Sequence, residues 1–181
     1  MDLGLRGKVA IVTGATANIG RAIALELAAE GVCLVAVGRD AQAGARIVGL
    51  ARERGAMNAV FVAADMLDPA SPARILEAAE KLGPVAVLVN GVGGNIDQGF
   101  FADSDPAKWL GDIDLNFGTV LRMTHAVLPG MIARRSGSIV NIGSTAGIVG
   151  DYMLPVYSAM KGAVHSFTKV LAKEVGQHGV R

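Results

Sequence analysis

The stretch VAIVTGATANIG, residues 9–20, decides the fold class of this chain. Its first five residues are a largely apolar, β-branched run of strand length, and Ile19, Ile23 and Leu27 then repeat at helical spacing. The glycine-rich turn between them joins a strand directly to a helix. Glycines there permit a tight bend and let the backbone approach a pyrophosphate, which then rests on the free N–H groups of the helix N-terminus. We therefore expect a dinucleotide site whose turn residues are Gly14, Thr16, Asn18, Ile19 and Gly20.

The rest of the chain repeats this alternation of short apolar runs with longer alanine-rich stretches. Strands are expected at residues 33–37, 59–63, 85–89 and 138–142, and helices at 41–54, 72–82, 106–134 and 155–177. The runs are apolar nearly throughout, which is typical of parallel strands covered on both faces. Five strand–helix alternations imply right-handed crossovers. The sequence therefore predicts an α/β fold in one domain over residues 1–181, a Rossmann-type doubly wound parallel sheet of strand order 3-2-1-4-5.

Composition and charge argue against several other classes of protein. The chain has 17 basic and 16 acidic residues, so no electrostatic footprint favours nucleic acid or an anionic membrane as a partner. Its apolar runs are too short to span a bilayer, and its N-terminus lacks the layout of a signal peptide. The single cysteine, Cys33, rules out an internal disulfide and fits a reducing compartment, so we expect a cytoplasmic protein. The three histidines have no metal-ligand spacing, and no metal site is expected.

A tyrosine and a lysine in the last helix form the strongest catalytic signal. Tyr157 and Lys161 are four residues apart and therefore lie on one face of the predicted helix. An ammonium beside a phenol favours the phenolate, which turns an otherwise weak group into a base. In isolation such a pair is more often an ordinary surface pair, and Ser144 alone is more often a cap at a strand end. Their joint placement at the carboxyl ends of strands, where doubly wound sheets bind ligands, favours an active site.

Five motifs, in the correct order, resemble those of classical short-chain dehydrogenases/reductases. The first turn resembles the family's T-G-x-x-x-G-x-G, with Asn18 in place of the middle glycine, and asparagine tolerates a positive φ better than most residues. The others are NGVG at 90–93, Leu115-Asn116, NIGS at 141–144 and Y-x-x-x-K at 157–161. NGVG departs from the family's N-N-A-G at two positions. The resemblance covers essentially the whole chain and implies an NAD(P)-dependent oxidoreductase that interconverts a secondary alcohol and a ketone.

The resemblance implies a catalytic role for four residues. Tyr157 is the proton donor and acceptor during hydride transfer. Lys161 favours the phenolate form of Tyr157 and also binds the hydroxyls of the nicotinamide ribose. Ser144 hydrogen-bonds the substrate oxygen and holds it within reach of Tyr157. Asn116 distorts its helix and holds a water that relays protons to Lys161.

Segments after the third and fourth strands are implied to hold the cofactor as well. Asp65 accepts a hydrogen bond from the adenine amino group, and the backbone of Met66 assists it. Asn90 and Gly91 are cofactor-binding positions by resemblance, although the Asn90 side chain is better suited to tying neighbouring strands together. Glycine at this point lets the backbone pass close to the adenosine ribose.

The end of the second strand indicates which dinucleotide is used. An acidic residue there binds the ribose 2′-hydroxyl of NAD, whereas a nearby arginine suits the 2′-phosphate of NADP. The chain reads Val37-Gly38-Arg39-Asp40, so Gly38 occupies the acid position and Arg39 can clamp the phosphate. The neighbouring Asp40 and the lack of a second basic residue in 15–17 weigh against this, and an ordinary solvated role for Arg39 stays open. We expect NADP to be favoured over NAD.

The family pattern continues past Arg181 with a sixth strand, a substrate loop and a seventh strand. By this resemblance the chain lacks those later strands, and strand 138–142 is expected to be an open apolar edge. Two functions stay open. The first is an oxidoreductase acting on a small alcohol or ketone, with 3-oxoacyl thioesters, sugars, steroids and cyclic diols as substrate classes. The second is a truncated, inactive or weakly active dinucleotide-binding and oligomerisation module. A homo-oligomer is expected through the helices that carry Asn116 and Tyr157, where subunits of the family meet.

Overall fold

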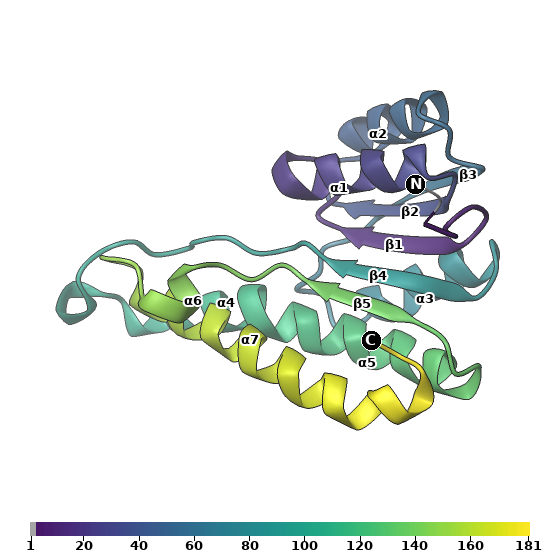
Figure 1. Ribbon diagram of the computed structural model, residues 1–181. Helices are drawn as coiled ribbons and strands as arrows, with labels where there is room; N and C mark the ends of the chain where they lie inside the picture. The colour runs from purple at the N-terminus through teal and green to yellow at the C-terminus, as the bar shows by residue number, and fades with distance from the viewer. Residues whose placement is uncertain (1–2) are drawn as a thin grey trace.

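Five parallel strands build one sheet in the computed structural model, which describes residues 3–181 (Figure 1). In spatial order they are β3 (Asn58–Ala63), β2 (Cys33–Gly38), β1 (Val9–Thr13), β4 (Val85–Asn90) and β5 (Ser138–Asn141). Every neighbouring pair is parallel. The predicted strand order and the doubly wound α/β class are thereby confirmed, and each predicted strand lies within one residue of its observed bounds.

Helices cover both faces of this sheet (Figure 1). On one face lie α1 (Asn18–Ala29) and α2 (Ala41–Glu53), and on the other lie α3 (Ser71–Glu80), α5 (Thr119–Ala133) and α7 (Pro155–Val175). Beyond the carboxyl ends of the strands, the loop after β4, α4 (Pro106–Ile113) and α6 (Ala146–Val149) form an arm that projects from the sheet. Residues that are distant in the sequence meet at the base of this arm.

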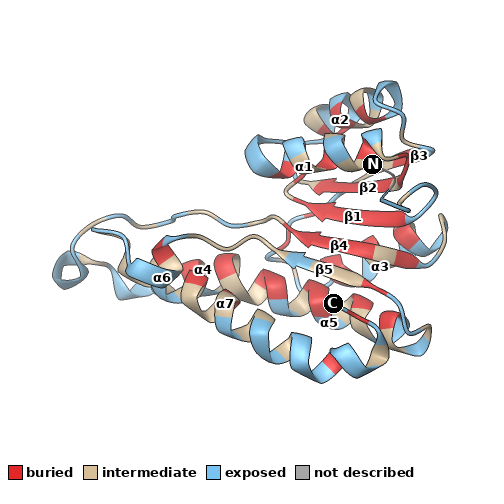
Figure 2. Cartoon of the chain, in the orientation of Figure 1, coloured by how far each residue is buried: buried red, intermediate tan, exposed pale blue. Residues whose placement is uncertain are grey.

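The central strand supplies both hydrophobic cores. Alternate residues of β1 point to opposite faces, so Val9 and Ile11 pack with the α3, α5 and α7 side, while Ala10 and Val12 pack with α1 and α2. All five residues of β1 are buried, and Figure 2 shows the buried band running through the neighbouring strands. Two-sided burial explains why these strands read as continuous apolar runs rather than as alternating ones.

The helix predicted over 106–134 is interrupted around Asn116, where the resemblance implies a distortion. The chain forms α4, then a π-helical turn η2 (Asp114–Gly118), then α5. The Thr119 N–H donates to the carbonyl of Asp114 five residues earlier, which is the π-helical pattern. Neither α6 nor the 3₁₀ turn η1 (Phe101–Asp103) was predicted, because elements of three or four residues are too short to show a hydrophobic period.

Strand β5 has one well-paired edge and one largely open edge. On the open side, Ile139 N–H donates to the carbonyl of Arg181 at 2.8 Å, and Arg181 N–H donates to the carbonyl of Gly137 at 3.1 Å. This short bridge around Val180 is the only pairing on that side within residues 3–181. Val140 is 44% exposed. The predicted open apolar edge is therefore present along most of β5.

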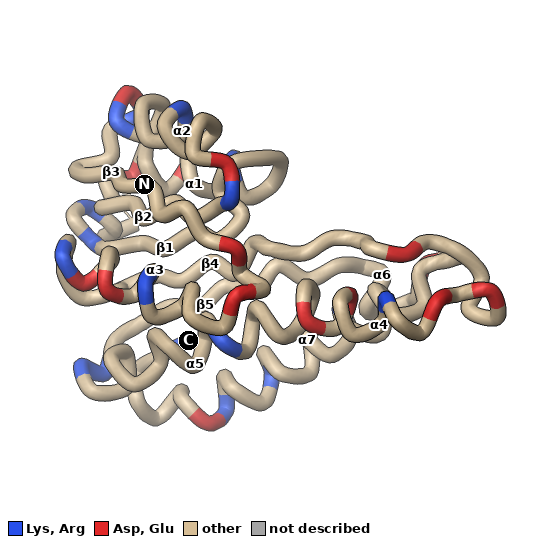
Figure 3. The backbone as a smooth tube through the Cα atoms, turned by 180° about the vertical axis from the view of Figure 1, so that it is seen from behind, with Lys and Arg blue, Asp and Glu red and all other residues tan. Residues whose placement is uncertain are grey.

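Charges of both signs are interspersed around the sheet in the view of Figure 3, where the projecting arm carries mainly acidic residues. Among residues 3–181, no helix combines the length and apolar character needed to cross a membrane. The same residues contain no group of three or more His, Cys, Asp or Glu side chains arranged to hold a metal ion.

Candidate active site

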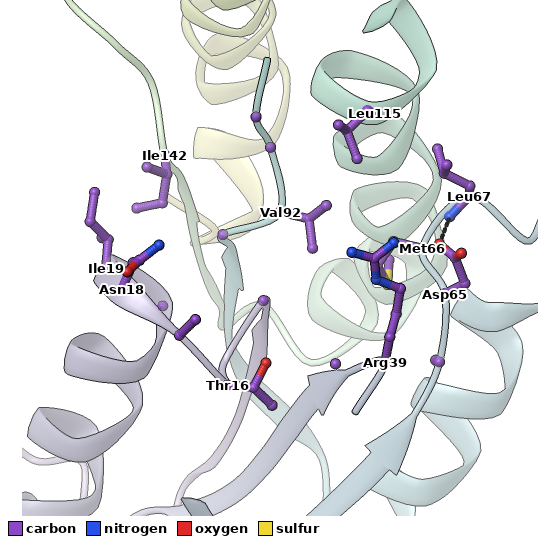
Figure 4. Close-up of a pocket in the computed structure, with 18 of the residues that line it drawn as sticks. Thr16, Asn18, Ile19, Arg39, Asp65, Met66, Leu67, Val92, Leu115 and Ile142 are labelled. Carbon is purple, nitrogen blue, oxygen red and sulfur yellow. Dashed lines mark hydrogen bonds between the residues drawn. The ribbon is translucent and has the colours of Figure 1, made fainter. Parts of the chain in front are cut away.

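A cavity of about 590 Å³ opens at the carboxyl ends of the strands (Figure 4). The turns after β1, β2, β3 and β4, the segment after β5, and α7 all contribute to its lining. The predicted site residues that line it are Gly14, Thr16, Asn18, Ile19, Gly20, Arg39, Asp65, Met66, Gly91, Tyr157 and Lys161. The other three predicted site residues, Asn90, Asn116 and Ser144, do not line it directly. One cavity thus contains both the glycine turn and the Tyr157–Lys161 pair.

Backbone geometry explains the glycines of the first turn. Gly14 has a φ of +69°, and a Cβ there would come within 3.1 Å of the carbonyl oxygen of Gly91. A Cβ at Gly20 would overlap the carbonyl of Gly14. Asn18 has a φ of +46°, so asparagine tolerates here the left-handed conformation expected for the middle glycine. These constraints fold the turn tightly against the start of α1.

The N-terminus of α1 presents unpaired backbone donors at this cavity. Within residues 3–181, no side chain caps the helix at Ala17, and the first turn carries no acidic residue. The first N–H groups of a helix have no partner inside it and carry the positive end of its dipole. Because Asn18, Ile19 and Gly20 line the cavity, this helix end fits an anion such as a pyrophosphate.

From the end of β2, Gly38 and Arg39 line the cavity, and Asp40 does not. A Cβ at Gly38 would lie 2.8 Å from the Thr16 Cγ2 atom, so a longer side chain there would displace Thr16. Arg39 lines the cavity and is exposed, with no hydrogen bond or ion pair to another residue of the described chain. Figure 4 shows Arg39 on the same side of the cavity as Asp65 and Met66.

The carboxylate of Asp40 serves α2 rather than the cavity. Asp40 Oδ1 accepts hydrogen bonds from Gln42 N–H at 2.8 Å and Ala43 N–H at 3.0 Å, which makes it the N-cap of that helix. The bonds from Ala43 and then Gln42 lower the pKa of Asp40 below its ordinary value. Asp40 is therefore an ionised cap at neutral pH.

The loop after β3 forms the side of the cavity opposite the helix α1 residues in Figure 4. Asp65 is exposed, and its Oδ1 accepts a hydrogen bond from Leu67 N–H at 3.0 Å. Its carbonyl accepts one from the Ser71 hydroxyl at 2.6 Å, which fixes the loop to the start of α3. Met66 is 4% exposed. The second carboxylate oxygen of Asp65 has no partner in residues 3–181 and can accept a hydrogen bond from a ligand.

Asn90 ties elements together instead of facing the cavity. It is 3% exposed, and its Nδ2 donates to Thr124 Oγ1 on α5 at 3.1 Å and to Asn141 Oδ1 on β5 at 2.8 Å. The next residue, Gly91, does line the cavity, and a Cβ there would lie 2.5 Å from the Thr13 carbonyl oxygen. The Asn90 side chain therefore ties β4 to β5 and α5, and its place among the cofactor-binding positions stays a prediction.

Tyr157 and Lys161 lie on the face of α7 that meets the cavity. The Lys161 Nζ atom is 5.7 Å from the centre of the Tyr157 ring and donates a hydrogen bond to the Ile142 carbonyl at 2.9 Å. Lys161 is only 4% exposed, and this burial lowers the pKa of its ammonium below the ordinary value. The helical spacing therefore brings the two functional groups together beside the segment that follows β5.

That segment also carries Ser144. Ile142 and Gly143 line the cavity, and Ser144 Oγ accepts a hydrogen bond from Ala146 N–H at 3.1 Å. A hydroxyl that accepts one bond keeps its own proton for donation. A Cβ at Gly143 would overlap the imidazole of His165, one turn beyond Lys161 on α7. The backbone thus positions the hydroxyl, and the segment that carries it lies against α7 at Gly143.

Asn116 lies in the π-helical turn and holds the loop after β4. It is fully buried; its Oδ1 accepts from Gly94 N–H at 3.0 Å, and its Nδ2 donates to the Gly94 carbonyl at 2.7 Å. A Cβ at Gly93 would lie 3.0 Å from Lys161 Nζ and 3.1 Å from Asn116 Oδ1. The predicted distortion of the helix is present and the side-chain amide bonds the loop, while the water that would relay protons to Lys161 stays a prediction.

Sequence reasoning missed Asp112, which supports the same loop. Asp112 is 1% exposed, and its Oδ1 accepts from Ile96 N–H at 3.1 Å and lies 3.5 Å from Asn116 Nδ2. Its position four residues before Asn116 places both side chains on one helix face, which is the signal that could have found it. The missed residue Thr13 acts similarly: its Oγ1 accepts from Gly91 N–H at 3.0 Å and links the first and fourth turns.

Comparison with known proteins identifies the family. A family model described as short chain dehydrogenase matches residues 8–181. An uncharacterised oxidoreductase of Staphylococcus saprophyticus is 36% identical over 181 residues, which cover 98% of this chain and 76% of that protein. The 3-oxoacyl-[acyl-carrier-protein] reductase FabG of Pseudomonas aeruginosa is 33% identical over 178 residues, covering 98% of this chain and 72% of that enzyme.

Solved structures agree with these relatives. The L-sorbose reductase of Gluconobacter frateurii, complexed with NADPH and L-sorbose, matches with a TM-score of 0.93 and 30% identity, covering all of this chain and 69% of that one. An NAD⁺-bound xylitol dehydrogenase matches with a TM-score of 0.93 and 27% identity, covering 98% and 68% of the two chains. The chain therefore belongs to the short-chain dehydrogenase/reductase family, whose members are alcohol and ketone oxidoreductases.

Proposed function

We propose that this chain binds NADP and interconverts a secondary alcohol and a ketone, with Tyr157 as the general acid and base. The observation that carries the proposal is that one cavity is lined both by the glycine turn at the α1 N-terminus and by Tyr157 and Lys161. When bound, the dinucleotide supplies or accepts the hydride. The chain's own residues must then hold the substrate and move a proton.

The proton chemistry follows from the Tyr157 surroundings. The Lys161 ammonium beside the ring favours the phenolate, so Tyr157 Oη takes the proton of an alcohol or returns it to an alkoxide. The free proton of the Ser144 hydroxyl is suited to hydrogen-bonding the substrate oxygen. Asn116 and Asp112 hold the loop after β4 beside Lys161 and keep the cavity in shape for both groups.

The cavity residues fit a dinucleotide. Four of the glycines that line the cavity bring the backbone to its border. A Cβ would overlap backbone atoms at Gly20 and Gly91, and it would be crowded at Gly14 and Gly93. The α1 N-terminus suits the pyrophosphate, and Asp65 with the Met66 backbone suits the adenine. Lys161 suits the hydroxyls of the nicotinamide ribose.

The end of β2 favours NADP over NAD. Gly38 has no side chain to offer at the acid position, and Asp40 caps α2 through Oδ1 and does not line the cavity, so no carboxylate of residues 37–40 borders the place of the ribose 2′-hydroxyl. Arg39 is exposed and unpaired within residues 3–181, as a 2′-phosphate clamp requires. The NADPH complex of the sorbose reductase and the NAD⁺ complex of the xylitol dehydrogenase are both compatible with the fold.

Arg39→Ala tests this choice. A charge-assisted hydrogen bond to phosphate contributes about 1.5–3 kcal/mol, so NADP binding should weaken roughly 10- to 150-fold while NAD binding changes little. Calorimetric titration of both nucleotides into the full chain measures this. The matched control Arg46→Ala removes an exposed arginine from the middle of α2 and should change neither affinity. Equal losses for NADP and NAD in Arg39→Ala, or a preference of the unsubstituted chain for NAD, would contradict the assignment.

Among substrates, we propose a 3-oxoacyl thioester or a comparable small ketone. The 3-oxoacyl-[acyl-carrier-protein] reductases among the relatives support this class, and sorbose in the reductase complex supports sugars as the comparison. Nicotinamide absorbance with a panel of ketones and alcohols measures turnover. Nucleotide binding without turnover on any of them would instead favour the second candidate, a binding and oligomerisation module.

Exposed apolar side chains on three helices favour association of the chain with copies of itself. The faces of α4, α5 and α7 that point away from the sheet carry exposed apolar side chains, among them Leu110 (75% exposed), Leu121 (36%) and Val170 (54%). Such side chains on adjacent helices favour a homo-oligomer formed through α5 and α7. The unpaired thiol of Cys33 fits the reducing conditions of the cytoplasm, where we place the enzyme.

A further inference from the structure

One arginine behind the cavity joins two segments that line it from different elements. Arg122 lies on α5, and its Nη1 and Nη2 contact Asp114 Oδ1 and Oδ2 at 2.5 and 3.2 Å. Its Nη2 also donates to the Met66 carbonyl at 3.0 Å. Asp114 begins the π-helical turn, whereas Met66 belongs to the loop after β3. A single guanidinium therefore bridges the two segments.

The geometry of this bridge depends on arginine. The planar fork presents several N–H donors in fixed directions, so it can hold both carboxylate oxygens and a carbonyl, whereas a lysine ammonium is a point charge. The Arg122 side chain is 26% exposed, and its Nε is buried without a hydrogen-bond partner in residues 3–181. An unpaired buried N–H carries a free-energy cost. The three hydrogen bonds of the Nη atoms offset that cost and hold the side chain in place.

Gly118 makes room for the bridge. A Cβ on Gly118 would overlap the Asp114 carboxylate and lie 3.1 Å from Arg122 Nη1. The ion pair therefore lies directly against the backbone of the π-helical turn. Two residues after Asp114, Asn116 uses its amide to hold Gly94. A shift of the ion pair would be transmitted to this amide through one short, rigid turn.

At its other end, the bridge reaches the part of the cavity assigned to adenosine. Met66 and its neighbours Asp65 and Leu67 line the cavity, and Leu115 lines it between Asp114 and Asn116. Figure 4 shows Leu115 and Leu67 on the same side as Met66. The guanidinium of Arg122 thus fixes both the Met66 carbonyl and the Asn116 turn.

We propose that Arg122 is a positioning residue that couples the adenosine end of the cavity to the Asn116 turn. Binding of a nucleotide at the loop around Met66 then orders the Asn116 turn and the Gly93–Asp97 loop. Ordering of these two segments, in turn, favours nucleotide binding. The inference rests on the proposed dinucleotide binding, but it adds that the two ends of the site communicate through α5. Coupling between sites is reciprocal, so either end reports on the other.

Hydrogen-exchange mass spectrometry with AMP tests the coupling in the full chain. AMP is the adenosine half of NAD and, without the 2′-phosphate, of NADP. Leu115 of the turn lines the cavity on the Met66 side, so the Arg122 variants separate direct contact of AMP with the turn, which they retain, from coupling, which they lose. In the unsubstituted chain, saturating AMP should slow exchange at residues 64–68 and also, by about fivefold or more, at 93–97 and 114–118. In Arg122→Met, AMP should slow exchange at 64–68 only. The control Arg54→Met, which removes an exposed pair with Glu26 at 3.6 Å, should keep both effects.

Arg122→Lys is measured in parallel, because it keeps the positive charge beside Asp114 even if the methionine variant folds poorly. It should retain AMP protection at 64–68 and lose most of it at 114–118. Full protection of the turn in Arg122→Lys or in a folded Arg122→Met contradicts the coupling. Protection confined to 64–68 in the unsubstituted chain also contradicts it. No protection at 64–68 in the unsubstituted chain contradicts the proposed nucleotide binding itself, which separates the two failures.

Discussion

Tyr157 gains its chemical character from its neighbours at the scale of single residues. A tyrosine and a lysine four apart occur on many helix surfaces, but here Lys161 is 4% exposed and bonded to the Ile142 carbonyl. The ammonium is thereby held beside the phenol instead of moving in solvent. Burial also lowers the pKa of Lys161, so the same contact that orients the group makes its charge easier to lose. The pair is a defined site rather than a fluctuating surface contact.

Tyr157→Phe tests the role of the hydroxyl. The substitution removes one oxygen and keeps the ring, so we expect turnover to fall at least about 100-fold while nucleotide affinity stays nearly unchanged. Nicotinamide absorbance and calorimetric titration measure the two quantities. Tyr152→Phe is the matched control, since Tyr152 is 79% exposed and meets Phe100 only through its ring. Retention of more than a few per cent of the activity in Tyr157→Phe would refute proton transfer by this residue.

At the scale of elements, the site depends on how strand ends are fixed to helices. Asn90 at the end of β4 joins β5 through Asn141 and α5 through Thr124. Asn141 Nδ2 in turn donates to Thr168 Oγ1 on α7 at 2.9 Å. This chain of side-chain hydrogen bonds links β4 and the edge strand β5 to α5 and α7. The turn after β4 and the segment after β5 are thereby held in register at the cavity.

Asn90→Ala separates a structural role from a cofactor role. The variant leaves Asn141 Oδ1 and Thr124 Oγ1 without their buried donor, so the free energy of unfolding should fall by about 1–3 kcal/mol, with nucleotide affinity changed little. Urea unfolding and calorimetric titration measure both effects. Asn95→Ala, at an exposed loop position, is the control that should alter neither. A large loss of nucleotide affinity at unchanged stability would instead support direct contact of Asn90 with the cofactor.

At the scale of the whole molecule, the helices that carry the site also carry its exposed apolar surface. Phe117 of the π-helical turn meets Phe167 of α7 at 5.9 Å between ring centres, so the two helices share one apolar layer. Val170 is 54% exposed one turn further along α7. An association through this surface would brace Asn116 and Tyr157 from outside. Formation of the oligomer would then stabilise the arrangement of the catalytic residues.

Val170→Asp tests association through α7. A carboxylate in an apolar contact must be desolvated without a partner, so the dissociation constant of the oligomer should rise at least about tenfold. Sedimentation velocity at several protein concentrations measures it. Met57→Asp places the same charge at a 59% exposed apolar position before β3 and should leave association unchanged. A monomeric unsubstituted chain at micromolar concentration, or equal effects of the two variants, would contradict an interface at α7.

Much of the architecture was predictable because its signals are local. Each strand is a short apolar run bounded by turn residues, and β1 matches its predicted bounds fully. The positive φ of Asn18 also follows from a local rule, since few residues other than glycine tolerate that conformation. The π-helical turn was less accessible. Its sequence continues the helical pattern on both sides. The family resemblance implied a distortion at Asn116, but its π-helical form over 114–118 is visible only in the structure, where Asn116 holds Gly94 and Asp114 meets Arg122.

The sequence by itself determined the family, the strand order and the identity of the residues that gather at the cavity, because these depend on short-range periodicity and on motif spacing. Only the tertiary structure decided which groups each side chain serves. Asp40 caps α2, Thr13 links the first and fourth turns, and Arg122 spans from Met66 to Asp114. The physical reason is that hydrogen-bonding capacity is limited and is used by the nearest partners in space. Residues 56 positions apart become such partners only when the sheet has brought their loops together.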